Sequence, residues 1–346
     1  MMTEILDCTI RDGSYLIENN WSSADIKGIT AGLAQCGLKY IEVGNGMGLG
    51  ASRQGIKSLC TDEEYIRLAR EVKGASKIGV FFIPSIGTLD DITLLKACGG
   101  DFIRIGTDVS RSDTAKTYIE HARALGLEVG FNFMKSYAAT PFELCKRAVR
   151  IEQYGAQIIS LVDSAGGMLP KEVGRYMALL RESVDVHLGF HGHNNLLMAN
   201  ANSLAAVEQG ADIIDTTLMG MGRGAGNAQT ETMLVLLKKS GQDLGINPIA
   251  VSEISQKYIL PKTNSLKGAN DLQMVMGDAQ FHDAFLNTVI EVAALNQIDS
   301  RALIIEISKI NKENPSRDLM DHIARRIKSG VSMHIFRPKF YHKEMQ

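Results

Sequence analysis

A repeated alternation of short apolar runs with longer amphipathic segments most constrains what this chain can fold into. The runs are rich in Ile, Val and Phe and mostly end at Gly, Asp, Asn or Thr, which is typical of parallel strands buried on both faces. They cover residues 4–9, 40–44, 77–83, 101–106, 128–133, 158–163, 186–190 and 212–217. Helical patterns cover residues 22–37, 61–74, 88–100, 112–126, 140–155, 170–183, 196–210 and about 229–240. Such strand–helix units predict an α/β fold whose parallel sheet closes into a (β/α)8 barrel over residues 1–241.

An open, doubly wound sheet is the alternative to a closed barrel. Such sheets usually have fewer strands and a glycine fingerprint in the first strand-to-helix turn. The first turn here reads "DCTIRDG" at residues 7–13 and lacks that fingerprint. The sequence therefore favours the TIM barrel.

The C-terminal part of the chain has a different pattern. A break in composition, "SGQDLGINP" at residues 240–248, follows the eighth helical segment, and residues 249–335 show only helical patterning. We expect these residues to form a helical appendage that packs on the barrel or on a partner, and a homodimer interface is an equally good interpretation. Residues 336–346 show no clear period and are expected to form an extended or poorly ordered tail.

Charge and cysteine content exclude several classes of protein. A formal net charge of −2 over 346 residues provides no basic field for nucleic acid. The five cysteines are scattered and form no CxxC pair, which indicates reduced thiols in the cytoplasm. The N-terminus resembles neither a signal peptide nor an anchor, and no run reaches the ~18 apolar residues of a membrane span. We therefore expect a cytoplasmic protein.

The ends of the strands are where functional side chains would gather, because barrel active sites lie at the C-terminal face. Residues that follow different apolar runs should therefore converge in space. The candidates are Asp7, Arg11, Asp12 and Tyr15, then Glu42 and Asn45, Asn132 and Lys135, Asp163 and Ser164, and finally His191 and His193.

The segment "FHGHNNL" at residues 190–196 places two histidines two residues apart. On extended backbone their side chains point the same way. Such a pair alone could bind a metal ion or merely hydrogen-bond to loop carbonyls. Asp12 favours the metal, because the first strand lies close to the seventh in a closed barrel. One carboxylate and two imidazoles suit an octahedral Mn²⁺ or Mg²⁺ with open positions, and Zn²⁺ is also compatible.

Two more features belong to the same face. The glycine-rich "GMGRGAGN", which ends at Asn227, suits a phosphate-cradling loop or tight backbone packing. Asn227 could cap the next helix or reach the metal. Arg11 could stabilise an enolate or a carboxylate, or it could form a structural salt bridge with Glu42 or Asp163.

Several motifs together resemble the DRE-TIM metallolyase superfamily, and within it the 4-hydroxy-2-oxovalerate and related 4-hydroxy-2-oxoacid aldolases. The motifs are "DCTIRDG", "IEVGNG", "VDSAGG", "HGHNNL", "ANSLAAVEQGAD" and "GMGRGAGNA". The resemblance covers the barrel. It also reaches "MVMGDAQFHDAFL" at residues 274–286, which is similar to the family's tyrosine-bearing segment.

The resemblance implies a metal site. Asp12, His191 and His193 match the family's metal ligands, which usually bind Mn²⁺, and Mg²⁺, Co²⁺ or Zn²⁺ are the other candidates. Asn227 matches an asparagine that ligates the metal in the related HMG-CoA lyases.

The resemblance also implies substrate contacts. Arg11 matches the arginine that stabilises a pyruvate enolate, and Ser164 matches a segment near the substrate carboxylate. Glu42 and Asn132 are expected to line the same substrate site.

Two positions depart from the family's pattern. The aldolases carry an acid/base histidine two residues beyond the glycine of "RDG", where this chain has Tyr15. Their C-terminal segment carries a tyrosine that faces the active site, where this chain has His282. The exchange could preserve a His/Tyr pair, select a different aldehyde or abolish aldol activity.

These residues predict a divalent-metal-dependent, pyruvate-type (class II) aldolase that cleaves or forms a 4-hydroxy-2-oxo acid through a metal-bound pyruvate enolate. The metal and Arg11 would share the enolate charge. Tyr15 or His282 would carry the proton, and histidine is better matched to neutral pH. A Schiff base on Lys135 is a less favoured route. The small-molecule partners would be a 2-oxo acid and an aldehyde.

Two other functions stay open. A Claisen-type condensing enzyme or an HMG-CoA-lyase-like enzyme would act on an acyl-CoA, although condensing members usually have Glu where Gly13 stands. A catalytically altered, partner-binding subunit is the second alternative. Residues 249–335 resemble the segment through which the family's aldolases contact an acylating aldehyde dehydrogenase, and we also expect a homo-oligomer.

Overall fold

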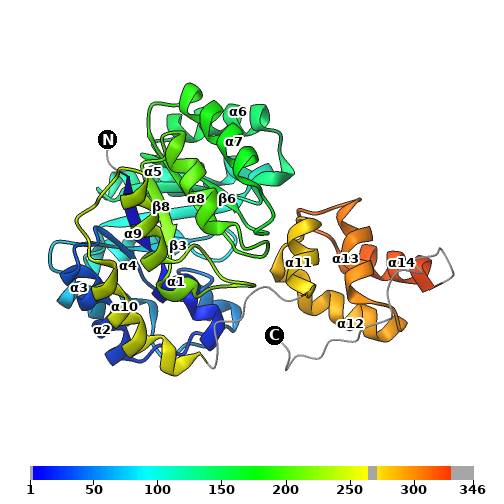
Figure 1. Ribbon diagram of the computed structural model, residues 1–346, viewed down its shortest axis with the longest axis horizontal. Helices are drawn as coiled ribbons and strands as arrows, with labels where there is room; N and C mark the ends of the chain where they lie inside the picture. The colour runs from blue at the N-terminus through cyan, green and yellow to red at the C-terminus, as the bar shows by residue number, and fades with distance from the viewer. Residues whose placement is uncertain (1–2, 264–270, 329–346) are drawn as a thin grey trace.

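Eight parallel strands form a closed barrel in the computed structural model, which describes residues 3–263 and 271–328 (Figure 1). Each strand pairs with the next one along the chain, and β8 pairs with β1. The prediction of a (β/α)8 TIM barrel is confirmed. The strands are β1 (Glu4–Asp7), β2 (Tyr40–Glu42), β3 (Lys77–Phe82), β4 (Phe102–Asp108), β5 (Glu128–Met134), β6 (Ile158–Asp163), β7 (His187–Gly192) and β8 (Ile213–Thr216).

Helices surround the barrel, and further helices follow it in the chain. Several of the barrel helices begin at a Ser or Thr whose side chain accepts a backbone N–H of the first turn, as at Ser22, Thr61 and Thr140. No helix within residues 3–263 and 271–328 is both long and apolar enough to cross a bilayer. The helices are α1 (Thr9–Asp12), α2 (Ser23–Gln35), α3 (Asp62–Val72), α4 (Leu89–Ala97), α5 (Lys116–Ala124), α6 (Pro141–Gln153), α7 (Pro170–Ser183), α8 (Ala199–Glu208), α9 (Thr230–Lys239), α10 (Pro248–Tyr258), α11 (Asp271–Asp278), α12 (Leu286–Asn296), α13 (Ser300–Ser308) and α14 (Arg317–Lys328).

The end of β1 differs from the expectation that the strand continues to residue 9. The chain turns at once into the short helix α1, because the carboxylate of Asp7 accepts the backbone N–H of Thr9 at 2.9 Å and the hydroxyl of Thr230 at 2.9 Å. Thr9 in turn accepts the N–H of Leu218 at 2.8 Å. These bonds fix α1, whose four residues are all buried, at the end of the strand.

Helix α10 belongs to the barrel's hydrophobic core. It packs on α2 and α9, and Val251, Ile254 and Ile259 join the buried cluster of the barrel. The segment from residue 249, which the sequence predicts as the appendage, therefore begins with a helix that covers the barrel. The sequence pattern predicts a helix here, but it does not show that α2 and α9 are the surfaces on which its apolar side chains pack.

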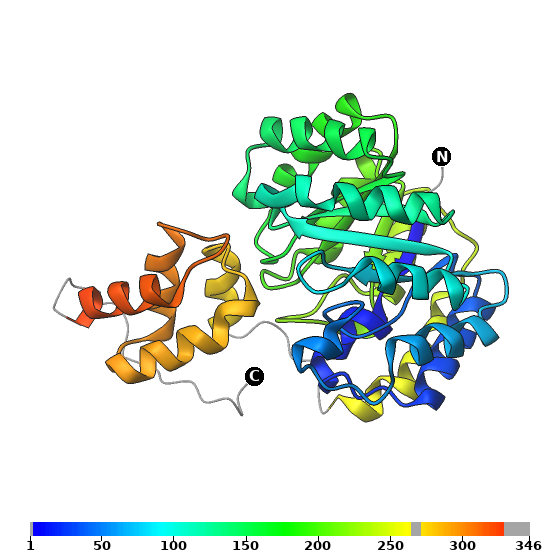
Figure 2. The same ribbon diagram turned by 180° about the vertical axis from the view of Figure 1, so that it is seen from behind.

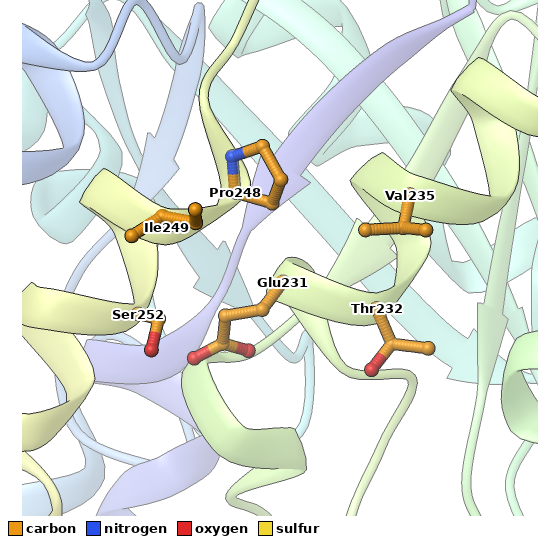
Figure 3. A pocket seen from close by; sticks show the side chains of 6 residues that line it. All are labelled: Glu231, Thr232, Val235, Pro248, Ile249 and Ser252. Carbon is orange, nitrogen blue, oxygen red and sulfur yellow. The ribbon is translucent and has the colours of Figure 1, made fainter.

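Glu231 on α9 lies beside α10 in the hollow that Figure 3 shows, and it connects α10 to the loop that follows β8. Its carboxylate accepts the N–H of Met219 at 3.1 and 3.2 Å and the hydroxyl of Ser255. Met219 has a left-handed backbone with φ 55°, so this acceptor supports a conformation that non-glycine residues rarely adopt. Glu231 also lines a surface hollow of about 380 Å³ between α9 and α10.

Helices α11 to α14 form a cluster with a hydrophobic core of its own. Phe281, Met276 and Leu303 are fully buried in this core. Both views show α11 as the helix of this cluster nearest the barrel and α14 as the farthest (Figures 1 and 2). The tail expected at residues 336–346 lies outside the described residues.

Lys135 holds this helical cluster against the mouth of the barrel. It follows β5, has a left-handed φ of 54° and is only 7% exposed. Its ammonium group donates to the carboxylate of Asp108 at 3.1 Å and to the carbonyl of Glu313 at 2.6 Å. It also lies 5.1 Å from the ring centre of Phe285. Ser110 adds a backbone N–H to the Glu313 carboxylate at 3.2 Å.

The buried carboxyl of Asp7 should make stability depend on pH. Burial raises the pKa of Asp7 from 3.8 to about 6 despite the bonds from Thr9 and Thr230. The folded state therefore retains this proton longer than the unfolded chain, so the contribution of Asp7 to stability is fully present below pH 4 and is lost as pH rises through 6. The gap corresponds to about 3 kcal/mol.

In Asp7→Asn, the amide oxygen can accept the Thr9 N–H and the amide nitrogen can donate to the Thr230 hydroxyl oxygen. We expect this variant to raise the free energy of unfolding at pH 8 by up to about 3 kcal/mol and to change it little at pH 4. Urea denaturation of both proteins at the two pH values measures this difference. A variant that is less stable at pH 8 would show that the ionised carboxylate stabilises the fold.

The Lys135 contact can be tested by amide hydrogen exchange. Lys135→Met keeps the aliphatic stem and removes two charge-assisted hydrogen bonds, which are worth about 1.5–3 kcal/mol each. We expect exchange at least several-fold faster in residues 280–285 and 310–314, and no change in the barrel strands. Lys146→Met, on an exposed part of α6, is the matched control. Equal exchange in the wild type and the Lys135 variant would contradict the docking role.

Candidate active site

The two histidines of β7 lie side by side at the barrel mouth. β7 ends at Gly192, two residues beyond its expected end. His191 therefore lies within the strand, and His193 directly follows it. The rings of His191 and His193 have centroids 5.0 Å apart and are nearly perpendicular. They are 4% and 8% exposed. The predicted juxtaposition is confirmed.

Helix α1 brings Asp12 to the same place. Its Oδ1 accepts a hydrogen bond from Arg11 Nη1 at 2.5 Å, and its Oδ2 accepts one from Asn227 Nδ2 at 2.5 Å. Burial alone would raise the pKa of Asp12, but the charges of Arg11, His193 and His191 hold it well below its usual range. The group is therefore a carboxylate at any physiological pH.

Asp12, His191 and His193 could together hold a metal ion. One ligand atom from each lies within 4.8 Å of those of the other two, and all three side chains are buried. Among the described residues, Nδ1 of His193 is buried without a hydrogen-bond partner. Burial lowers the pKa of His193 to about 4 although Asp12 opposes the shift, so the ring is neutral at pH 7 and its lone pair can bind a cation.

Asn227 lies opposite His193 in an isolated antiparallel bridge. The first residue before α9 is Gln229, so Asn227 does not cap that helix. Its Oδ1 is another buried atom that has no partner within the described part of the chain, and it could serve as a further ligand. The glycines of this loop permit the close approach, since a Cβ on Gly222 would lie 2.2 Å from Asn227 Nδ2.

Arg11 lies between two carboxylates. Its Nε donates to Glu42 Oε2 at 2.6 Å, and its guanidinium carbon lies 4.8 Å from the ring centre of Phe81. Of the two salt-bridge partners considered from the sequence, Glu42 is the one observed. Asp163 instead accepts the backbone N–H groups of Gly167 and Met168 at 3.2 and 2.9 Å.

Two residues behind these side chains were missed by the sequence reasoning. Asp215 on β8 lies 2.9 Å from Nδ1 of His191, which leaves Nε2 of that ring for a metal. Arg104 on β4 pairs with Asp215 and with both oxygens of Glu42. The signal was a charged residue that follows two apolar residues in the interior of each of two strands, in "DFIRIG" and "DIIDTT".

Tyr15 does not present its hydroxyl to the metal-binding side chains. The hydroxyl donates to the carbonyl of Gly46 at 2.9 Å, and burial raises the pKa of Tyr15. The guanidinium of Arg223 covers the ring at 4.1 Å. Arg223, from the glycine-rich loop, also approaches Asp283 of the helical cluster at 3.5 Å. It is a third residue of the mouth that sequence reasoning missed.

His282 comes from the helical cluster and immediately precedes the 3₁₀ turn η7 (Asp283–Phe285). Its Nδ1 accepts the backbone N–H of Ala284 at 3.1 Å. Burial lowers the pKa of His282 well below its usual value, and the positive charges of Arg223 and Lys135 lower it further. The charges of His193 and Asp12 also contribute to this pKa.

Three predicted substrate residues lie near these groups, and their contact with substrate stays a prediction. The hydroxyl of Ser164 accepts the N–H of Lys135 at 2.9 Å. Asn132 is 2% exposed on β5, and its Oδ1 is a third buried atom that lacks a partner among residues 3–263 and 271–328. Both oxygens of Glu42 are held by arginines.

Comparison of the sequence with known proteins finds a matching family and relatives that share one name. The HMGL-like family matches residues 2–257. A protein of Moorella thermoacetica named 4-hydroxy-2-oxovalerate aldolase is 34% identical over 322 residues, which span 92% of this chain and 95% of the relative. A protein of Bacillus cereus with the same name is 33% identical over 321 residues and covers 92% and 94%.

Solved structures share the fold. The N-terminal domain of a proposed aldolase from Bacteroides vulgatus superposes with a TM-score of 0.69 at 27% identity, over 81% of this chain and 94% of that one. The carboxyl transferase domain of Rhizobium etli pyruvate carboxylase gives a TM-score of 0.79 at 18% identity, over 95% of this chain and 62% of that one. The second likeness concerns the fold alone.

These matches are long enough to show the family to which this chain belongs. The family match spans the barrel and α10, and the named relatives align along almost the whole of both chains. The histidine pair of "HGHNNL" and the aspartate of "DCTIRDG", two of the motifs that carry the resemblance, meet at one mouth. This chain belongs to the HMGL-like family, that of the DRE-TIM metallolyases, and is a lyase.

Proposed function

We propose that this protein is a divalent-metal-dependent aldolase that cleaves or forms a 4-hydroxy-2-oxo acid, with pyruvate as one product of cleavage. The observation that carries the proposal is the buried set of Asp12, His191 and His193 with the guanidinium of Arg11 directly beside it. The names of the relatives, 4-hydroxy-2-oxovalerate aldolase, support the reaction class.

The donor set suits an ion that prefers oxygen and nitrogen ligands. Asp12 offers a carboxylate, His191 and His193 offer neutral imidazole nitrogens, and Asn227 Oδ1 could add an amide oxygen. Mn²⁺ is the ion we favour, and Mg²⁺, Co²⁺ and Zn²⁺ are the alternatives. When bound, the ion supplies Lewis-acid polarisation of the substrate's keto oxygen.

Arg11 is assigned to the charge that develops on the substrate. Its Nε and Nη1 donate to Glu42 and Asp12, so Nη2 is the donor that we assign to the enolate oxygen. In cleavage, the C4 hydroxyl loses its proton and the C3–C4 bond breaks. The electron pair of that bond forms the C2–C3 double bond of the enolate, and the aldehyde leaves. Protonation at C3 then gives pyruvate.

His282 is the proton carrier that we favour over Tyr15. The Tyr15 hydroxyl is bonded to the Gly46 carbonyl and its pKa is raised, so it is a poor base. His282 is neutral at pH 7 because burial and nearby cations lower its pKa. To accept a proton on Nε2, its ring hydrogen must lie on Nδ1, which requires the bond from the Ala284 N–H to break.

Lys135 has no free amine for a Schiff base in this arrangement, because its ammonium group donates to Asp108 and to the Glu313 carbonyl. The aldolase we propose therefore uses the metal route. Ser164 and Asn132 are retained as substrate contacts. A homo-oligomer and an acylating aldehyde dehydrogenase partner, which would consume the aldehyde, are further parts of the proposal.

The proposal predicts Mn²⁺-dependent pyruvate release. Protein freed of metal by chelation should release no pyruvate from 4-hydroxy-2-oxopentanoate, and added Mn²⁺ should restore turnover. Coupling to lactate dehydrogenase and NADH measures the product. Asp12→Asn should reduce kcat/KM by at least about 10²-fold, because it weakens both the metal site and the Arg11 contact.

Three other results would redirect the assignment. Turnover that survives chelation would contradict the metal route. Release of a free thiol from an acyl-CoA, with no pyruvate from the oxo acid, would favour the Claisen-type or HMG-CoA-lyase-like alternative. Failure to bind any divalent ion would favour the partner-binding subunit.

The proton carrier is tested by a matched pair of variants. His282→Gln should lower kcat by about 10²–10⁴-fold, the usual contribution of a general acid or base. Tyr15→Phe removes one hydrogen bond to a backbone carbonyl and should lower kcat by less than about 10-fold. Both are measured at saturating Mn²⁺, with circular dichroism as the control for folding. The reverse order of effects would assign the proton to Tyr15.

A further inference from the structure

Arg104 is a charged side chain in the centre of the barrel, where it is 2% exposed. It belongs to β4 and is bound entirely by carboxylates. Its Nε and Nη2 donate to the two oxygens of Glu42 at 2.7 and 2.8 Å, and its Nη1 pairs with Asp215. With all three of these donor atoms engaged by protein, Arg104 acts on other side chains rather than on substrate.

Each carboxylate that Arg104 binds also orients one side chain of the proposed site. Glu42 Oε2 accepts the Nε–H of Arg11 at 2.6 Å. Asp215 Oδ2 lies 2.9 Å from Nδ1 of His191. Arg104 is therefore the shared neighbour of two groups that come from different parts of the chain, α1 and β7.

Stability does not explain a charge at this depth. Buried ion pairs are often no more stabilising than well-packed apolar side chains of similar volume. The neighbouring interior cluster of this barrel is apolar and comprises Leu6, Cys8, Tyr40, Phe102, Ile158 and Ile213. Gly130, which pairs with Arg104 across the sheet, leaves room for the arginine stem, since a Cβ there would lie 3.3 Å from Arg104 Cγ.

We propose that Arg104 is a positioning residue that fixes His191 and Arg11 together and thereby couples metal affinity to turnover. This inference rests on the proposed function, in which His191 binds the ion and Arg11 binds the enolate. The planar guanidinium fork can bind two carboxylates at fixed angles, whereas the point charge of a lysine in the same place can hold only one of them well.

The test compares Arg104→Lys with the wild-type protein. Free Mn²⁺ is measured by electron paramagnetic resonance during titration, which gives the Kd without any enzymatic turnover. We expect the Kd for Mn²⁺ to rise about 10- to 100-fold, as for other residues that orient metal ligands. We also expect kcat for pyruvate release to fall at saturating Mn²⁺, because the orientation of Arg11 is lost as well.

The matched control is Arg181→Lys. Arg181 pairs with Asp212 at 3.2 Å and donates to the carbonyls of Val184 and Val186 near the opposite ends of β7 and β8. It should change neither quantity. An Arg104→Lys protein with a lowered melting temperature but a wild-type Kd and kcat would overturn the proposal, because Arg104 would then be merely structural. A wild-type protein that binds no Mn²⁺ would instead refute the proposed function.

Two further variants decide the question if Arg104→Lys does not fold. Asp215→Asn removes the charge that joins Arg104 to His191, and it should raise the Kd for Mn²⁺ with Arg11 still held. Glu42→Gln removes the charge that joins Arg104 to Arg11. It should lower kcat, while the Kd for Mn²⁺ changes less than threefold. Equal effects of the two variants on the Kd, or no effect of either, would overturn the proposal.

Discussion

Three carboxylates and two guanidinium groups form one buried ion-pair network beneath the barrel mouth, and the site depends on this arrangement. Removing one partner from such a buried network leaves an uncompensated charge, which costs several kcal/mol. The side chains of Asp12, Glu42 and Asp215 are therefore held in one geometry by Arg11 and Arg104. The set has one negative charge in excess, which favours a cation beside Asp12. The closed sheet makes this possible, because it brings β1, β2, β4 and β8 around one axis.

The helical cluster adds the opposite charge to the same mouth. Lys135 holds the cluster through the Glu313 carbonyl, and Arg223 approaches Asp283. These two cations lower the pKa of His282 and would attract an anionic 2-oxo acid. The cluster therefore docks on the barrel through charged groups as well as through packing. In the function that we propose, the barrel would hold the cation and the enolate, and the cluster would add a neutral ring beside two positive charges.

The sequence was sufficient for those parts of the site that depend on short-range periodicity. A period of two places His191 and His193 on one face of a strand, and eight strand–helix units imply the barrel that brings Asp12 to them. Arg104 and Asp215 were not found, because their partners depend on the register between strands that are far apart in the chain. For residues 249–335 the sequence left packing on the barrel or on a partner open, because the apolar face of a helix such as α10 does not reveal which surface will cover it.

Tyr15 and His282, where the resemblance leads us to expect an exchange of histidine and tyrosine, have different surroundings in this structure. Tyr15 lies beneath Arg223 and its hydroxyl is bonded to a backbone carbonyl, so a phenol at this position mainly completes the wall of the mouth. His282 precedes a 3₁₀ turn, and its Nδ1 is tied to the N–H of Ala284. The hydroxyl of Tyr15 and the ring of His282 therefore offer different chemistry at the mouth. Because burial and the cations of the docked mouth hold the pKa of His282 down, the seating of the cluster on Lys135 sets the basicity of the ring to which we assign the proton.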